Sequence, residues 1–486
     1  MLWYDGSIRN AIHYGIQKGD WPLYQPPKYF YSLQALIVSK ADNLAKLLRL
    51  LQRGPSKTAV ILRELDVSQP TFSRLWAAVR NGVALGASKA RLYALRRAVP
   101  GVHAPIPVFR VSEDGLPEPI GYLDVLQGEF YAVTPLEGTS YDVYQGMPFF
   151  VRDLRPQGFL GRMEPGKHKD LDLPADILHW TDEQVLKYIS RRSESAAGDL
   201  ILGNESYARY IESSVVEERS VILDEERAQR YPRMAEESMQ GEAPGSSAGG
   251  EQPKFTAVIR RGDAGAVEHV IVKFSPPLNT PSGRRWGDLL VCEHLALQVL
   301  ARNGIAAAKT SILEFGERVF LEVVRFDRVG LKGRRPMATF SALDGDLGMM
   351  DQSWTAVARE LGRLGELAEK DIVTVEILDL FGALIGNTDK HHGNIAVAWT
   401  FERKHRLLDA YDMLPMLYRP NSHGEIVARE WTPSYMGRLE LRHLSKCHDM
   451  AMQFWRDVLS DSRISDDFKG VADRHVMALR PLAPDA

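Results

Sequence analysis

The stretch IGNTDKHHGN, residues 385–394, lies between an apolar segment at 375–386 and a short apolar segment at 395–399. The first flanking segment is typical of a buried helix, and the second is typical of a buried strand. Within the stretch, Asp389 and Asn394 have the D-x4-N spacing of kinase catalytic loops. A carboxylate at the first position would orient an attacking hydroxyl and accept its proton.

A second acidic side chain is expected to return to this loop. After a turn at 401–405, the segment RLLDAYD ends in Asp412, and a hairpin with residues 395–399 would bring Asp412 and Asn394 to the same end. Their oxygens are of the kind that binds Mg²⁺. Asn, Asp, His and Gly also form ordinary turns, which is the alternative interpretation. The position of the loop between a buried helix and an apolar hairpin favours catalysis.

Three upstream segments supply the other parts needed for ATP-dependent phosphoryl transfer. Lys273 lies in the apolar strand HVIVKF, where an ammonium is costly unless it meets a partner. Glu293 shares the apolar stripe of a predicted helix at 287–304, so we expect it to face inward and to pair with Lys273. The glycines of the Gly/Ser-rich stretch at 245–250 would let backbone N–H groups approach phosphates. Each feature has an alternative when taken singly: Lys273 would be an edge-strand lysine that faces water, Glu293 would lie at the margin of the apolar stripe, and the Gly/Ser-rich stretch would be a linker.

A basic module is predicted near the N-terminus. Between Lys40 and Val99, twelve Lys and Arg face three acidic residues, an excess of +9 in a chain of net charge −3. An amphipathic helix is predicted at 41–52, a second helix begins near Ser56, and Ser68 is placed as the N-cap of a third. This is the order of a helix-turn-helix, whose second helix enters the major groove of DNA.

DNA contacts are expected at the start of the third helix and in a following β-wing, from Ser68, Gln69, Thr71, Ser73, Arg74, Lys89 and Arg91. A helical hairpin that serves only for packing is the alternative. The local excess of positive charge favours a polyanionic partner for this module.

The composition limits the class of protein. The chain has 486 residues, of which 44% are hydrophobic and 25% charged, which is typical of a globular protein with several domains. Its two cysteines are far apart in sequence and match no metal-ligand spacing, so a disulfide scaffold is not expected and a reducing, cytoplasmic location is indicated. No apolar run is long enough for a membrane span, and the N-terminus lacks a secretory signal. Residues 1–39 form an extension without an assigned function, and short antiparallel strands are expected between 105 and 136.

These segments, in this order, resemble the HipA family of bacterial toxin kinases. The matching stretches are SSAGGEQPKF (246–255), IVKF (271–274), the helix with Glu293, VVRFDR (323–328), IGNTDKHHGN (385–394) and LLDAYDMLP (407–415). The phrase VSQPTFSRL (67–75) is similar to recognition helices of bacterial winged-helix regulators. The added N-terminal module resembles the YjjJ-like branch of the family, in which DNA binding and kinase lie on one chain, whereas other HipA systems leave DNA binding to a separate antitoxin.

The resemblance implies an α+β, bilobal, protein-kinase-like (HipA-like) fold preceded by a winged helix-turn-helix domain. The expected boundaries are 40–100 for the DNA-binding domain and 105–325 for an N-terminal lobe with a small β subdomain and the nucleotide loop. Residues 326–486 would form a mainly helical C-terminal lobe.

The resemblance also implies ATP and Mg²⁺ as cofactors, with Asp389 as catalytic base, His391 beside it, and Asn394 and Asp412 as metal ligands. His392 is left to a structural role. Nucleotide contacts are expected from Gly249, Gly250, Lys254, Lys273, Glu293, Val324 and Phe326. The backbone around Val324 and Phe326 would meet the adenine, and Lys273 would contact the phosphates. Ser246 matches a loop serine that family members autophosphorylate, and Ser247 is the alternative.

The expected partners are operator-like DNA and a protein substrate, such as an aminoacyl-tRNA synthetase or a translation factor. A homodimer would let two winged helices read two half-sites. Two other functions stay open. A DNA-binding regulator whose kinase fold only senses nucleotide would have been free to lose Lys273, Asp389, Asn394 and Asp412. A metal-dependent nuclease built on the 385–394 loop would leave the upstream ATP-site segments without a purpose.

Overall fold

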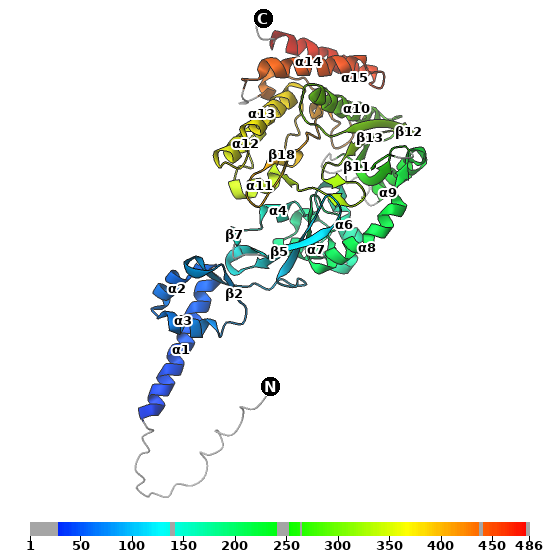
Figure 1. Cartoon of the computed structure of the whole chain (residues 1–486). Helices are drawn as coiled ribbons and strands as arrows, with labels where there is room; N and C mark the ends of the chain where they lie inside the picture. Colours follow the sequence, from blue (N-terminus) through cyan, green and yellow to red (C-terminus); the bar gives the residue numbers. More distant parts are fainter. Residues whose placement is uncertain (1–27, 137–140, 241–251, 263–264, 437–440, 483–486) are drawn as a thin grey trace, which may run out of the picture.

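The computed structural model describes residues 28–136, 141–240, 252–262, 265–436 and 441–482. The chain forms an elongated molecule, with the N-terminal part protruding from a larger body and the last helices at the opposite end (Figure 1). The predicted nucleotide loop residues Ser246, Ser247, Gly249 and Gly250 lie outside the described residues. None of the described helices is long and apolar enough to cross a membrane.

The N-terminal part contains three helices and a small three-stranded sheet. The helices are α1 (Lys28–Gln52), α2 (Thr58–Leu65) and α3 (Gln69–Trp76), and the strands β1 (Ser56–Lys57), β2 (Gly82–Leu85) and β3 (Leu92–Leu95) have the order β1-β3-β2. The first helix thus begins well before residue 41. Ser68 is at the N-cap of α3 as expected, but its hydroxyl is 3.0 Å from that of Thr71 and caps no backbone N–H.

The N-terminal part packs on the body through its small sheet. Side chains of this sheet, such as Leu85 and Ala94, share an apolar cluster with Leu126 and Ala132. The hydroxyl of Tyr141 donates a hydrogen bond to the carbonyl of Ala90, between β2 and β3, at 2.6 Å. The loop that was expected to act as a wing is therefore held against the body.

A five-stranded antiparallel sheet follows, with the order β7-β6-β5-β4-β8. Its strands are β4 (Ile106–Val111), β5 (Pro117–Val125), β6 (Phe130–Pro135), β7 (Asp142–Gln145) and β8 (Leu200–Leu202). The first three are the strands expected from the sequence. The helices of this part are α4 (Phe149–Arg152), α5 (Gly158–Arg162), α6 (Glu164–Lys167), α7 (Asp182–Arg192) and α8 (Asn204–Ser220).

A second five-stranded sheet has the order β12-β13-β11-β10-β9 and is covered by one helix on each face. Its strands are β9 (Ile222–Leu223), β10 (Lys254–Arg260), β11 (Val267–Phe274), β12 (Thr310–Phe315) and β13 (Arg318–Val324), and the helices are α9 (Arg227–Gln240) and α10 (Pro281–Arg302). Val270, Val272 and Phe274 pack with α9. Because side chains alternate along a strand, Lys273 projects from the opposite face, on the side of α10.

The remainder is mainly helical. Its helices are α11 (Phe340–Leu347), α12 (Trp354–Arg363), α13 (Glu369–Leu384), α14 (Leu444–Ser460) and α15 (Asp466–Leu479). Two short sheets accompany them, formed by β14 (Arg328–Val329) with β15 (Gly333–Arg334) and by β16 (Ala338–Thr339), β17 (Ala396–Ala398) and β18 (Arg406–Leu407). The hairpin expected after the 385–394 loop is the β17–β18 pair. One cluster of buried side chains runs from the first large sheet through α10 to α15, so these parts share a core.

Candidate active site

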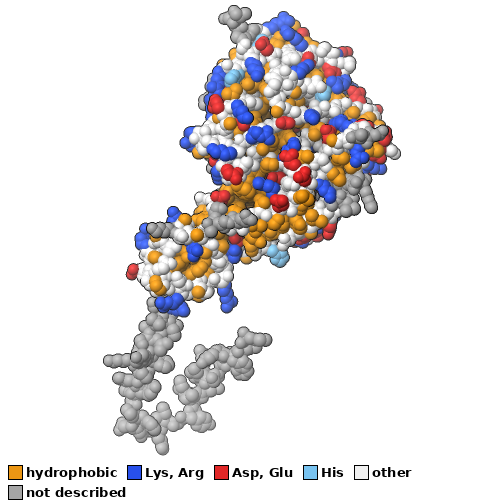
Figure 2. Space-filling model, in the orientation of Figure 1, with side chains coloured by type: hydrophobic (Ala, Val, Ile, Leu, Met, Phe, Trp, Pro, Cys, Tyr) orange, Lys and Arg blue, Asp and Glu red, His pale blue; other side chains and the backbone are white. Residues whose placement is uncertain are grey.

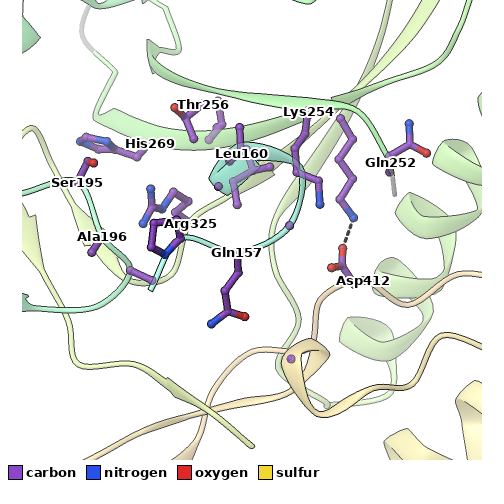
Figure 3. Close-up of a pocket in the computed structure, with 18 of the residues that line it drawn as sticks. Gln157, Leu160, Ser195, Ala196, Gln252, Lys254, Thr256, His269, Arg325 and Asp412 are labelled. Atoms are coloured by element: carbon purple, nitrogen blue, oxygen red, sulfur yellow. Dashed lines mark hydrogen bonds and ion pairs between the residues drawn. The ribbon is translucent and has the colours of Figure 1, made fainter. Parts of the chain in front are cut away.

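A cavity of about 1000 Å³ brings together seven of the residues predicted for catalysis, nucleotide binding and metal binding. Its lining comes from β10, β11 and α10, from the 385–394 loop, from the segment after β18, and from residues 153–197 of the first half of the chain. Figure 3 shows Lys254, Gln252 and Asp412 toward one end of this cavity, and His269, Ser195 and Ala196 toward the other. Segments that are far apart in sequence therefore meet around one space.

Lys273 lies at the centre of a buried charged group. It is 6% exposed, and its ammonium donates hydrogen bonds to both carboxylate oxygens of Glu293, at 2.7 and 2.6 Å, and to Asp412. Although burial alone would lower the pKa of Lys273, Asp412 and Glu293 raise it, so the side chain is a cation at all physiological pH values. Burial raises the pKa of the fully buried Glu293 in spite of the neighbouring ammonium.

Asp412 follows the β17–β18 hairpin in a left-handed backbone conformation, with φ of 52°. Such a conformation costs energy in a residue other than glycine, and it is typical of functional sites. Burial would raise the pKa of the Asp412 carboxyl, but Lys273, with a smaller contribution from Lys254, holds it at about 2. The preceding Tyr411 donates a hydrogen bond to the carbonyl of Gly393 at 2.8 Å, which ties the Asp412 segment to the 385–394 loop.

The loop at 385–394 is held in shape by its own amide side chains. The Oδ1 atom of Asn387 accepts a hydrogen bond from the backbone N–H of Asp389 at 3.0 Å. The Nδ2 atom of Asn394 donates to the carbonyl of Asp389 at 2.9 Å, which leaves its Oδ1 atom to face other partners. The backbone of Asp389 is thus fixed on both sides, while its carboxylate lies in the cavity lining with Asn394 and Asp412.

The two histidines of the loop have different surroundings. His391 is exposed and lines the cavity, and its backbone carbonyl accepts a hydrogen bond from the indole of Trp354 at 3.1 Å. The ring of His392 is buried between a carboxylate oxygen of Asp344, at 3.2 Å, and the carbonyl of Gln352, at 3.0 Å. The contacts of His392 are those of a residue that anchors the loop, which agrees with the structural role expected for it.

The backbone around Val324 and Phe326, which was expected to meet the base of a nucleotide, reaches the cavity at Arg325. Lys254 lines the cavity, but Val324 and Phe326 are absent from its lining, and Arg325 takes their place. The backbone N–H of Val324 donates to the carbonyl of Lys309 at 2.9 Å, and Phe326 packs on Tyr411 with ring centroids 5.5 Å apart. Val324 and Phe326 are the chain neighbours of Arg325. The N–H of Val324 and the ring of Phe326 make contacts within the protein.

Sequence reasoning missed the contribution of residues 153–197. Asp153 lines the cavity and accepts a hydrogen bond from the hydroxyl of Thr339 at 2.8 Å, and burial raises its pKa to about 6. Gln157 points into the same space (Figure 3). No local spacing relates this segment to residues 385–412, so only the tertiary structure reveals its place.

Hydrogen bonds from Arg328 and to Asp327 fix the backbone at the end of the cavity where Ser195 and Ala196 lie. The guanidinium of Arg328 donates to the carbonyl of Ala196 at 2.5 Å, and the backbone N–H of Gly198 donates to Asp327 at 2.9 Å. His269 faces the cavity nearby, and burial lowers its pKa to about 4, so it is neutral at pH 7. The lining at this end therefore combines a neutral imidazole and backbone groups with Arg325 and Arg328, which are both paired with Asp327.

The residues expected to bind DNA are absent from the cavity lining. On α3, Gln69, Ser73 and Arg74 are exposed, whereas Thr71 is half-buried. Arg91 is exposed, and its Nε atom donates to the carbonyl of Gly86 at 3.2 Å. The side chain of Lys89 lies outside the described part of the structure. Figure 2 shows Lys and Arg side chains around the N-terminal part and few acidic ones on the visible face.

Two segments of the chain match known families. Residues 102–211 match the family described as "YjjJ-like toxin, middle domain", and residues 246–474 match the "HipA-like C-terminal domain". The Toxin YjjJ of Escherichia coli (strain K12) is 34% identical over 443 residues, which cover 90% of this chain and 98% of that protein.

Two solved structures are also similar in part. The HipA chain of the Shewanella oneidensis MR-1 toxin–antitoxin complex of HipA, HipB and operator DNA has 14% identity and a TM-score of 0.44, covering 78% of this chain and 96% of that chain. The Helicobacter pylori proinflammatory kinase CtkA has 11% identity and a TM-score of 0.33, covering 48% of this chain and 90% of that chain.

Proposed function

Because this chain belongs to the HipA-like toxin family, we propose that it is an ATP- and Mg²⁺-dependent protein kinase that acts on serine or threonine hydroxyls. The observation that carries the proposal is the buried contact of Lys273 with both Glu293 and Asp412, in the wall of a cavity that also contains Asp389 and Asn394. An ammonium so placed would contact the phosphates of a nucleotide.

Asp389 is the proposed general base. Its carboxylate would orient the acceptor hydroxyl and accept its proton as the phosphoryl group is transferred. The fixed backbone of the loop would hold this carboxylate in place, and the exposed His391 would flank the acceptor. Such positioning groups act mainly by fixing the geometry of the reacting atoms.

The donor atoms fit a magnesium ion. The Oδ1 atom of Asn394 accepts no hydrogen bond from the described residues, and the low pKa of Asp412 keeps its carboxylate charged. Mg²⁺ prefers such oxygen ligands and usually takes only one or two of them from the protein. A Mg²⁺ ion held by Asn394 and Asp412 would offset negative charge on phosphate oxygens.

The proposal includes autophosphorylation at Ser246 or Ser247. Both serines belong to a segment that joins α9 to β10, and Gln252 and Lys254 at its far end line the cavity. Gly249 and Gly250 in the same segment would let the backbone approach the phosphates. The test is incubation of the purified chain with γ-labelled ATP and Mg²⁺, followed by intact mass and phosphosite mapping.

The expected result of that incubation is one added phosphate at Ser246 or Ser247. Unconsumed ATP and no added phosphate, in protein that binds DNA, would contradict the kinase proposal and favour a DNA-binding regulator. Incubation of the same preparation with supercoiled plasmid tests for the nuclease alternative. Exchange of each serine for alanine then identifies the modified position.

We also propose that the N-terminal part binds DNA through α3. The proposal of a winged helix is supported by the succession of α2, α3 and the β1-β3-β2 sheet, and by the exposed Gln69, Ser73 and Arg74 on α3. Because Tyr141 holds the loop between β2 and β3 against the body, α3 is expected to make most of the contacts.

Exchange of Arg74 for alanine should therefore weaken DNA binding roughly tenfold and reduce the slope of log affinity against log salt by about 1, since one phosphate contact is lost. Fluorescence anisotropy with labelled duplex DNA over a salt series measures both quantities. Arg406→Ala, which removes an exposed arginine of β18 on the body, is the matched control. Equal salt slopes for the two variants would rule out a phosphate contact by Arg74.

A further inference from the structure

Ten Lys and Arg side chains line the cavity, and nine of them have partners within the protein. These nine are Arg155, Lys167, Arg192, Arg230, Lys254, Lys273, Arg325, Arg328 and Arg334. The tenth is Arg419. Within the described part of the chain, its guanidinium has no hydrogen bond, ion pair or aromatic contact, although it is half-buried. None of its guanidinium nitrogens is among the buried unpaired polar atoms, so they stay accessible from the cavity and free to meet an anionic ligand.

The backbone that carries Arg419 is fixed on two sides. Arg285 of α10 donates a hydrogen bond to the carbonyl of Tyr418 at 3.0 Å. The backbone N–H of Leu417 donates to the carbonyl of Gly386, at the start of the 385–394 loop, at 3.0 Å. Arg419, which lines the cavity, thus belongs to a segment that is tied to both α10 and the proposed catalytic loop.

Arg419 is tied to the elements that also carry the charged group of the cavity. Helix α10, whose Arg285 is bonded to Tyr418, also contributes Trp286 and Leu290 to the lining, about two turns and one turn before Glu293. Glu293 is the partner of Lys273, and Asp412 lies on the same segment as Arg419. At the opposite end, with Ser195 and His269, the cations Arg325 and Arg328 are already paired with Asp327.

We propose that Arg419 binds the terminal phosphate of the nucleotide. The inference rests on the proposed kinase function. It gives the nucleotide two cations: Lys273 would contact the phosphates closer to the base, and Arg419 the terminal one. A guanidinium can donate two parallel hydrogen bonds to phosphate oxygens, and such charge-assisted pairs are stronger than neutral ones. Arg419 would thus distinguish nucleoside triphosphates from diphosphates.

The test is calorimetric titration of the full chain with adenylyl imidodiphosphate or ADP, both with Mg²⁺. Arg419→Met should weaken binding of the triphosphate analogue roughly 10- to 100-fold, because a charge-assisted hydrogen bond is lost, and should change ADP binding less than about threefold. Arg419→Lys should recover part of the loss. Arg456→Met, at an exposed position of α14, is the control and should leave both affinities unchanged.

The outcomes separate this inference from the function on which it rests. Equal losses for both nucleotides, or no loss for either, would overturn the contact with the terminal phosphate while the kinase proposal stands. An unchanged affinity for the triphosphate analogue together with weaker phosphorylation of an added protein would instead assign Arg419 to the acceptor, and would also overturn the inference. A wild-type chain that binds neither nucleotide would refute the proposed function itself.

Discussion

Replacing Asp389 with asparagine is expected to slow phosphate transfer by roughly 10²- to 10⁴-fold and to leave nucleotide affinity within about threefold of the wild type. The substitution removes the group that would accept the proton of the acceptor hydroxyl. The backbone groups of Asp389 that bond to Asn387 and Asn394 remain, so the loop should keep its shape. Initial rates of label incorporation measure transfer, and titration with adenylyl imidodiphosphate measures binding.

The control for this variant is Asp351→Asn, which makes the same chemical change at an exposed residue that is absent from the cavity lining. Its transfer rate should equal that of the wild type. A wild-type rate in Asp389→Asn would show that the base lies elsewhere. Loss of nucleotide binding together with transfer would instead mean that Asp389 is needed to form the cavity.

Local patterns predicted the parts of the site that are close together in sequence. The apolar helix, the 385–394 loop and the β17–β18 hairpin follow each other within about forty residues, so hydrophobic periodicity and turn residues were enough to place them. Lys273 and Glu293 were also predictable as a pair. A charged residue in an apolar strand and another on an apolar helix stripe each need a partner, and the two sites lie close in the chain.

The sequence did not predict the parts that depend on distant contacts. Asp153 and Gln157 line the cavity because residues 153–197 pack against it, and no spacing connects them with Asp412. The start of α1 at Lys28 and the docking of the loop at Ala90 on Tyr141 likewise depend on packing rather than on local propensity. Arg419 belongs to no sequence motif. It differs from the other cations of the lining only in its tertiary contacts, which the sequence does not reveal.

Exchange of Lys273 for methionine is expected to abolish measurable nucleotide binding and to lower the free energy of unfolding by about 3–5 kcal/mol. Glu293 is fully buried and would lose its cation, and removal of one partner from a buried pair is far more costly than removal of both. Urea unfolding followed by tryptophan fluorescence measures the stability. Lys46→Met, which breaks an exposed pair with Asp42, should change it by less than about 1 kcal/mol.

The double variant Lys273→Met/Glu293→Leu separates stability from binding, because it replaces the buried pair by apolar side chains of similar size. Asp412 also loses Lys273, but its side chain is 25% exposed and keeps the favourable charge of Lys254. It should return to within about 2 kcal/mol of the wild type in stability and still bind no nucleotide. Recovery of binding with stability would mean that Lys273 acts only through the fold.

The stability loss of Lys273→Met should also depend on pH, and the sign follows from Glu293. Burial already raises the pKa of this carboxyl with the ammonium present, so its removal must raise the pKa further. A folded-state pKa above the unfolded value means that the native state binds the extra proton, and stability therefore falls as pH rises through that folded pKa. The variant should lose more stability at pH 8 than at pH 5. An equal loss at both pH values would mean that Glu293 finds another cation, for which Lys254 is the nearest candidate by its electrostatic effect on the same carboxyl.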